Sequence, residues 1–377
     1  MKAKKLLSIS LALSPALALA AMLLLCGCSS GDKKPEDTPK DRLIHRLFTA
    51  VKDGKILYGH QDDLVYGHNW VVTDVTTDPL DRSDVKDVTG KYPAIVGFDL
   101  GGIERGDSLN LDGVPFELIA RAAVTHVERG GIVTFSWHAR NPLTGGDAWD
   151  VSSKEAVSSV LEEGAFHNDY MIWLNRLSDF FESLGDIPFI FRPYHENVGS
   201  WFWWGGDLCT PDQYKRLFGM THGYLTKVRG LENILWCYSP NAAADPKDFM
   251  DRYPGDIFVD IIGVDSYEWI GDSTLEEAGV RFTAEVKKAL TFLNTVGGDH
   301  HKLIALTETG LEGLEDPDWF SEVLYPAIKD FPIAYVLTWR NAHDRPGHFY
   351  APWKGFAAEE DFRTFAGLEK TELLNLD

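Results

Sequence analysis

The sequence predicts one (β/α)8 TIM barrel, an α/β fold, with enlarged loops at the C-terminal face of its strands. Eight short and almost continuously apolar runs indicate strands that are buried on both faces, as in a parallel sheet. Segments of helical pattern separate most of these runs, and such alternation is typical of β/α units. The alternative is an open doubly wound sheet, which is disfavoured because no G-x-G-x-x-G follows an early strand.

The expected strands are the runs 56–61, 93–100, 132–138, 234–240, 261–267, 303–310 and 333–340, with the fourth run of the series starting at Phe189. The expected helices are 41–52, 114–129, 153–184, 211–229, 275–293, 317–329 and 358–365. Their ends carry helix signals: Thr210 is an expected N-cap before Pro211, and Gly130-Gly131 is an expected stop. Eight such units fit a barrel of this length with long loops.

The first residues have the pattern of a bacterial lipoprotein signal peptide, predicted over 1–27. Three lysines precede an apolar run, and Leu25-Cys26-Gly27-Cys28 resembles a lipobox that would leave a lipidated Cys28. A plain signal peptide and an uncleaved anchor helix are the alternatives. Residues 28–40 are then a flexible tether and 41–377 the barrel domain. The expected location is the bacterial cell envelope, with a lipid anchor in the outer membrane at its periplasmic or surface face.

The composition limits the classes of ligand that the protein is expected to bind. The formal net charge of −21 repels phosphate backbones, so no nucleic-acid partner is expected, whereas an uncharged polysaccharide is compatible with this charge. The 12 tryptophans are many for one domain. They suit a sugar-binding cleft, with ordinary core and surface positions as the alternative. Cys209 and Cys237 would remain after cleavage; two free buried thiols are expected, with a disulfide as the alternative. A monomer is expected.

Polar residues follow the predicted strands, at the barrel face where active sites form. They are Asp99, His138, Arg192, His195, Glu196, Asp265, Tyr267, Glu308 and Arg340. Glu196 follows the fourth strand and Glu308 ends the seventh, so the two should face each other across the barrel mouth. Two carboxyl groups on either side of a bond are what glycoside hydrolysis needs, one to donate a proton and one to remain ionised.

Four motifs, in barrel order, carry a specific resemblance. They are Arg192-Pro193-Tyr194-His195-Glu196 with Trp201 five residues later, Val264-Asp265-Ser266-Tyr267, Leu306-Thr307-Glu308-Thr309-Gly310, and Thr338-Trp339-Arg340. With them the chain resembles a glycoside hydrolase family 26 β-mannanase, a family of retaining (β/α)8 enzymes. The resemblance covers the whole 41–377 domain, which is then catalytic.

The resemblance implies roles for individual residues. Glu196 would be the general acid/base and Glu308 the nucleophile, with Tyr267 holding Glu308 by a hydrogen bond. His138 would contact the sugar just before the scissile bond, while His195 is divided between substrate contact and a structural hydrogen bond. The remaining implied contacts are Trp201 as a sugar platform, Trp339 under the sugar at the cleavage point and Arg340 on the next sugar. Trp203 and Trp204 are left open between platform and packing.

The expected activity is endo-1,4-β-mannanase action on mannan, glucomannan or galactomannan, with no cofactor and no metal. Release of mannobiose from chain ends is an alternative, since loops 61–91 and 340–354 are long enough to wall off the cleft. A non-catalytic surface glycan-binding barrel is the alternative of a different class. The acidic run 78–87 is expected to be a solvated face.

Overall fold

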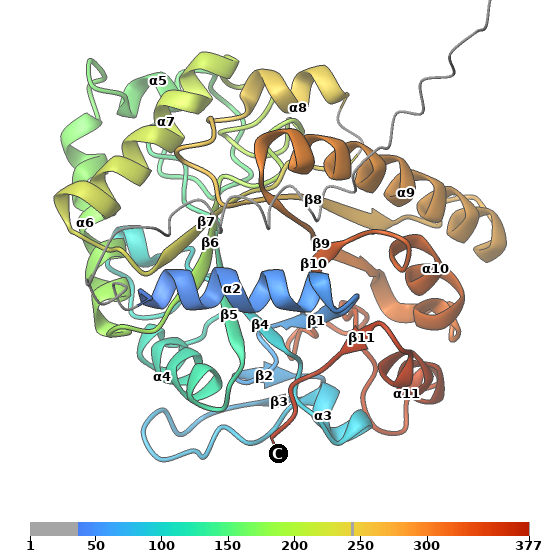
Figure 1. Cartoon of the computed structure of the whole chain (residues 1–377). Coiled ribbons are helices and arrows are strands. Elements are labelled where there is room, and N and C mark those ends of the chain that lie inside the picture. Colours follow the sequence, from blue (N-terminus) through green and yellow to red (C-terminus); the bar gives the residue numbers. More distant parts are fainter. Residues whose placement is uncertain (1–36, 243–244, 377) are drawn as a thin grey trace, which may run out of the picture.

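Eight parallel strands close into a barrel in the computed structural model, which describes residues 37–242 and 245–376 (Figure 1). The barrel strands are β1 Ile56–Gln61, β4 Ile95–Asp99, β5 Ile132–Trp137, β6 Phe189–Pro193, β7 Ile234–Tyr238, β8 Ile261–Glu268, β9 Leu303–Leu311 and β10 Ile333–Thr338. Neighbours pair in chain order, and β10 pairs with β1 to close the ring. The predicted fold class is therefore confirmed.

Helices cover the outside of the barrel (Figure 1). They are α3 Asp84–Thr89, α4 Phe116–Glu128, α5 Ala156–Val160, α6 His167–Ser183, α7 Pro211–Gly223, α8 Pro246–Arg252, α9 Leu275–His300, α10 Tyr325–Ile328 and α11 Glu359–Gly367. One π-turn, Tyr224–Val228, extends α7, and another, Phe320–Leu324, precedes α10. Short additions are the 3-10 turns Ile103–Arg105 and Glu312–Leu314, the hairpin β2 Tyr66–Gly67 with β3 Trp70–Val71, and β11 Thr371–Glu372 beside β1.

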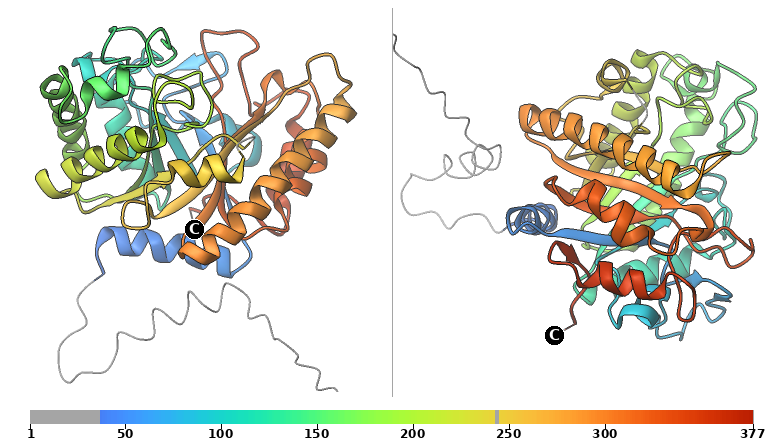
Figure 2. Two further views of the ribbon diagram at one scale, coloured as in Figure 1. Left: turned by 90° about the horizontal axis from the view of Figure 1, so that it is seen from above. Right: turned by 90° about the vertical axis from the view of Figure 1, so that its right-hand side faces the viewer.

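The helix α2, Pro39–Lys52, closes the N-terminal end of the barrel (Figure 1). Thr38 and Asp41 form a reciprocal capping box at its start, so the helix begins two residues earlier than expected. Its buried Leu43, Leu47 and Ala50 pack into the inner core of the barrel. A helix that covers this end leaves the opposite, C-terminal face as the open one, as Figure 2 (left) shows with α2 at the bottom.

Two apolar layers hold the fold together. The inner one lies between the strands and includes Leu57, Ile95, Ile190 and Leu235, whose side chains point into the barrel. The outer, larger one lies between the strands and the surrounding helices. Toward the C-terminal face the inward positions change from apolar to polar residues, which places the titratable groups at the barrel mouth.

Several sequence expectations need correction. The single helix expected over 153–184 is two, α5 and α6, with a turn at 161–166 between them. The helices α3 and α8 were not predicted, because both are short. The run 78–87 is not wholly a solvated face: Asp84 is buried and binds three donors.

The expectations for the cysteines and for the N-terminal segment have separate outcomes. Cys209 and Cys237 are both free buried thiols, as expected. Within the described residues no helix has the length and apolarity needed to cross a membrane. The predicted signal peptide, Cys28 and the tether up to residue 36 lie outside the described residues.

Candidate active site

Glu196 lies on a sharply turned segment just beyond β6. Both Tyr194 and Glu196 have left-handed backbone conformations, with φ of 52° and 53°. Such a conformation costs a non-glycine residue roughly 1–2 kcal/mol, so the surroundings must hold it. The buried Tyr194 hydroxyl is hydrogen-bonded to Tyr170 and to Thr221 (2.7 Å), and the Glu196 amide donates to the Ser239 carbonyl at 2.8 Å. These contacts aim the Glu196 side chain into the barrel mouth.

Glu308 reaches the mouth because of a β-bulge. In β9, Leu303 and Ala305 point into the barrel, so strict alternation would turn Glu308 outward. The pairing with β8 shifts between Val264 and Asp265, and Asp265 pairs with Glu308 instead of Thr307. An extra residue in one strand changes the direction of the side chains that follow it. The bulge therefore sets the Glu308 carboxylate beside Asp265.

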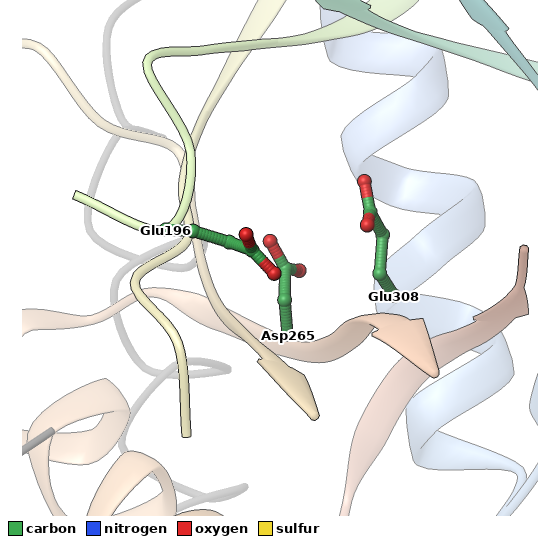
Figure 3. Close-up of side chains that lie close together, drawn as sticks. All are labelled: Glu196, Asp265 and Glu308. Carbon is green, nitrogen blue, oxygen red and sulfur yellow. The ribbon is translucent and has the colours of Figure 1, made fainter. Parts of the chain in front are cut away.

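Three carboxyl groups converge at the mouth: Glu196, Asp265 and Glu308 (Figure 3). One carboxylate oxygen can be chosen from each residue so that the three oxygens lie within 4.8 Å of one another. The buried Arg192 guanidinium donates to Asp265 at 2.9 Å and also to Glu308 Oε1. Tyr267 donates to Glu308 Oε2 at 2.8 Å, the hydrogen bond expected for it. Glu308 is thus held by two donors on opposite oxygens.

The electrostatics favour a protonated Glu196. Burial, and then the neighbouring Glu308, raise the pKa of Glu196 to about 7, against a lowering by the Trp201 hydrogen bond. Burial also raises the pKa of Asp265 well above its ordinary value, although Arg192 beside it acts in the opposite direction. A carboxyl group with a pKa near neutrality is suited to donate a proton at physiological pH.

His138, beyond β5, is fixed by a buried carboxylate. Its Nδ1 lies 2.7 Å from Asp99 Oδ2, and Ser136 donates to the same oxygen at 2.7 Å. Burial would lower the pKa of His138, but the Asp99 charge and hydrogen bond outweigh it and raise the pKa. The ring of Trp149, 49% exposed, stacks on the imidazole at 5.1 Å. His138 therefore has a fixed orientation at the barrel mouth, and its protonated form is favoured by Asp99.

His195 is buried, and its pKa is shifted in the opposite direction to that of His138. Burial first, and then Arg192 and His138, lower its pKa well below the ordinary value, so the ring is neutral. Its Nε2 is 4.0 Å from Glu308 Oε1, and its Nδ1 has no hydrogen-bond partner among the described residues. The ring also packs edge-on against His138 at 4.6 Å. This geometry is compatible with both roles considered for His195, contact with the substrate and structural support.

The tryptophans of the β6 loop divide into two kinds. Trp203 and Trp204 are fully buried, and their indole nitrogens donate to the carbonyls of Ala139 (2.9 Å) and His195 (2.8 Å). They are packing residues. Trp201 is 41% exposed and donates from Nε1 to Glu196 Oε2 at 2.6 Å. Trp339, after β10, is half-buried and lies 6.2 Å from His138 between ring centres.

Arg340 belongs to a cluster at one end of the cleft. Its guanidinium lies 3.1 Å from Asp112 Oδ1 and donates to the Tyr66 hydroxyl at 3.2 Å. Tyr66 in turn donates to Asp62 at 2.8 Å. Burial, and then the adjacent Asp112, raise the pKa of Asp62 well above its ordinary value. Arg340 is therefore held by groups from two other loops, the one after β1 and the one after β4.

The structure brings together every residue predicted for the site except Cys28, which lies outside the described residues. It also adds residues for which the sequence carries no role. Asp99, Arg192 and Asp265 stood out in the sequence as polar strand ends, the last two also within motifs, but without a role of their own. Their partners identify them as the groups that hold His138 and Glu308. Asp112 and Trp149 lie in long loops, where neither spacing nor periodicity marks them.

Comparisons with known proteins point to one family of glycoside hydrolases. The model of glycosyl hydrolase family 26 matches residues 35–299, more than half of the chain, and its matched range ends before Glu308. A mannan endo-1,4-β-mannosidase of Bifidobacterium adolescentis is 31% identical over 355 residues, which are 88% of this chain and 34% of that protein. One from Bacillus subtilis is 31% identical over 207 residues, 52% of this chain and 56% of that protein.

The chain thus spans between about a third and just over half of the length of these curated relatives. Among solved structures, a GH26 β-mannanase from Bacteroides ovatus superposes with a TM-score of 0.83 at 41% identity. That alignment covers 91% of this chain and 96% of the other. With this match, the family model and the arrangement of the barrel mouth, the chain belongs to glycosyl hydrolase family 26.

Proposed function

We propose that this protein is a β-mannanase that hydrolyses β-1,4-mannosidic bonds in mannan, glucomannan or galactomannan. The observation that carries the proposal is the pair of Glu196 and Glu308. One carboxylate oxygen of Glu196 lies within 4.8 Å of one carboxylate oxygen of Glu308. The named relatives are mannan endo-1,4-β-mannosidases, and this supports mannan as the substrate. The absence of a strong positive charge suits a neutral polysaccharide.

The proposed mechanism is a double displacement with retention of the anomeric configuration. Glu308 attacks the anomeric carbon while Glu196 protonates the leaving glycosidic oxygen, which gives a glycosyl-enzyme and a shortened chain. Glu196, now ionised, then removes a proton from water, the water attacks the anomeric carbon, and Glu308 leaves. The short separation of the two carboxyl groups supports this route, because inversion needs about 6.5–9.5 Å to admit a water.

Some of the surrounding residues would orient the catalytic groups, and others would bind the sugar chain. Arg192 and Tyr267 orient the Glu308 carboxylate through its two oxygens, and a carboxylate held in this way loses little entropy on attack. His138 and Trp339 would contact the sugar at the cleavage point, and Arg340 the next one. Trp201 would stack on a sugar and, through its indole N–H, contact the acid/base directly.

The first test follows the anomers that form as mannohexaose is cleaved, by proton NMR. Retention predicts that the β-anomer of the new reducing end appears first and then mutarotates. Glu308→Ala should reduce turnover by several orders of magnitude with an unchanged melting temperature, and added azide should give an α-mannosyl azide. First appearance of the α-anomer, or wild-type-like turnover in Glu308→Ala, would refute the double displacement. Failure of the wild type to release reducing sugar from mannan would favour a glycan-binding barrel.

Chain-end release of mannobiose is a second candidate, supported by contacts between the long loops after β1 and β10. The ring of His68 stacks on Trp353 at 3.3 Å and 7°, joining loop 61–91 to loop 340–354. The Asn341 amide donates to the buried Asp84 carboxylate at 2.9 Å and ties the same loops together. These contacts tie these two wall loops together beside Arg340, and a wall at that place would support a chain-end preference over internal cleavage.

Product analysis separates the two modes of action. Endo cleavage of galactomannan gives a ladder of oligosaccharides and a fast loss of viscosity. Chain-end cleavage gives mannobiose from the start, with a slow loss of viscosity. Mannohexaose with a reduced end shows which terminus is processed.

We also propose that the protein is a monomer anchored to the bacterial cell envelope through a lipid on Cys28. The lipobox-like Leu25-Cys26-Gly27-Cys28 supports the anchor. Labelling of cells with an alkyne fatty acid should tag the wild type, and Cys28→Ala should abolish the label and release the protein from membranes. An unlabelled wild type would contradict the anchor, and light scattering of the 41–377 domain tests the monomer.

A further inference from the structure

One tryptophan near the site has no assigned task. Trp269 follows β8 directly and is 75% exposed, more than any other tryptophan among the described residues. It stands two residues after Tyr267, which hydrogen-bonds to Glu308. Burial of an indole side chain stabilises the folded state, and a tryptophan that is 75% exposed gains little of this free energy. Its exposure therefore points to a partner that is absent in the free protein.

The turn that carries Trp269 is fixed. Arg281 of α9 donates to the Trp269 carbonyl and, at 3.0 Å, to Ser273 Oγ. The Ser273 amide donates to the Ile270 carbonyl at 3.0 Å, and the Ile270 side chain packs on the outer core. Gly271, with φ of 56°, closes the turn beneath the indole. A platform held in this way loses little conformational entropy when a ligand binds.

The direction of the side chains places Trp269 on the cleft side. Tyr267 points to Glu308, whereas Glu268 points away from the mouth and accepts a hydrogen bond from Trp319 at 2.8 Å. Trp269 is the first residue beyond β8, and continued alternation would turn it to the side of Tyr267. In Figure 2 (left) the β8–α9 turn stands at the upper right, on the face opposite α2.

The barrel order places Trp269 across the mouth from a loop that holds Arg340. Among the eight strands β8 is four positions from β4, so their loops face each other across the mouth. The loop after β4 carries Asp112, the ion-pair partner of Arg340. A sugar chain that runs from Arg340 past Glu196 and Glu308 would then continue toward the loops after β7 and β8.

We propose that Trp269 is a stacking platform for a sugar unit on the leaving-group side of the cleavage point, beyond the units that the catalytic pair contacts. The inference rests on the proposed function, in which Arg340 binds on the other side of the bond. An indole face stacks on the C–H face of a pyranose and needs no charge, which suits a neutral β-mannan. Trp269 then sets how strongly the enzyme favours long chains.

The test compares chain lengths. Values of kcat/KM are measured for mannotriose to mannohexaose with the wild type, Trp269→Ala, Trp269→Phe and Val280→Ala. The control residue Val280 is 67% exposed on α9, outside the cleft. An aromatic stacking contact is worth about 0.5–1.5 kcal/mol, so the hexaose-to-triose ratio should fall roughly 2- to 10-fold in Trp269→Ala. Trp269→Phe should restore part of the ratio, and Val280→Ala should keep the wild-type ratio.

Binding is measured separately by calorimetry of mannohexaose in the Glu308→Ala background. The additional Trp269→Ala change should weaken the affinity by a similar factor. An unchanged length ratio together with unchanged affinity overturns the platform. A wild type that cleaves none of the oligosaccharides refutes the proposed function instead, so the two failures are distinguishable.

Discussion

Trp201 sets the pH range of the proposed acid/base, and this can be tested by replacing it with phenylalanine. The indole N–H donates to Glu196 Oε2 at 2.6 Å and stabilises the ionised carboxylate, which lowers the pKa of Glu196. Trp201→Phe keeps an aromatic face but removes the donor, so the pKa of Glu196 should rise from about 7. Glu196 can act as an acid only while protonated, and the basic limb of the pH profile should therefore move to higher pH.

The size of the shift follows from the hydrogen bond. A hydrogen bond to a charged group contributes about 1.5–3 kcal/mol, and one pKa unit corresponds to about 1.4 kcal/mol, which gives a ceiling of roughly 1–2 units. Trp201 is 41% exposed, and water can take the place of the lost donor. We expect a shift of roughly half a unit to one unit in the basic limb.

The assay is kcat/KM on mannopentaose as a function of pH, which reports the free enzyme. Trp149→Phe is the matched control, because Trp149 is another exposed indole of the cleft whose ring stacks on His138. It should leave the basic limb in place. A basic limb that stays fixed in Trp201→Phe, or moves to lower pH, would show that this hydrogen bond does not control the acid.

Three further changes test the supports of the site and of the fold. Tyr267→Phe removes the 2.8 Å hydrogen bond to Glu308, and kcat/KM should fall about 10- to 100-fold while the melting temperature stays within a few degrees. Asp84→Ala leaves the buried donors of the two wall loops unpaired and should lower the free energy of unfolding by about 2–4 kcal/mol in urea titrations, whereas the exposed Asp81→Ala should not. Burial lowers the pKa of His126 to about 3, so the unfolded chain binds more protons between pH 6.5 and 3 and stability falls as the pH drops through that range. His126→Leu should make this fall shallower by up to about 1.4 kcal/mol per pH unit, and an unchanged slope would contradict the assignment.

The barrel was predictable because its signals are local. Each strand is one apolar run, and β1 was predicted with both of its ends correct, since every residue of Ile56–Gln61 is buried. The helix α7 begins where Thr210 and Pro211 predicted, with a complete capping box. The helices α3 and α8 were missed, because six or seven residues carry too little periodicity to stand out.

The sequence by itself determined the fold class and singled out the two glutamates as candidates, because a strand end and a motif can be read from neighbouring residues. Only the tertiary structure decided what surrounds them. The bulge in β9 that turns Glu308 inward arises from pairing with β8. The loops beside Arg340 are joined by residues more than two hundred positions apart, as in the Asn341–Asp84 contact. Trp201, Trp203 and Trp204 lie within four consecutive residues, yet Trp201 contacts Glu196 while Trp203 and Trp204 are buried in the core. Burial and partners made that difference, and both depend on segments that the local sequence does not contain.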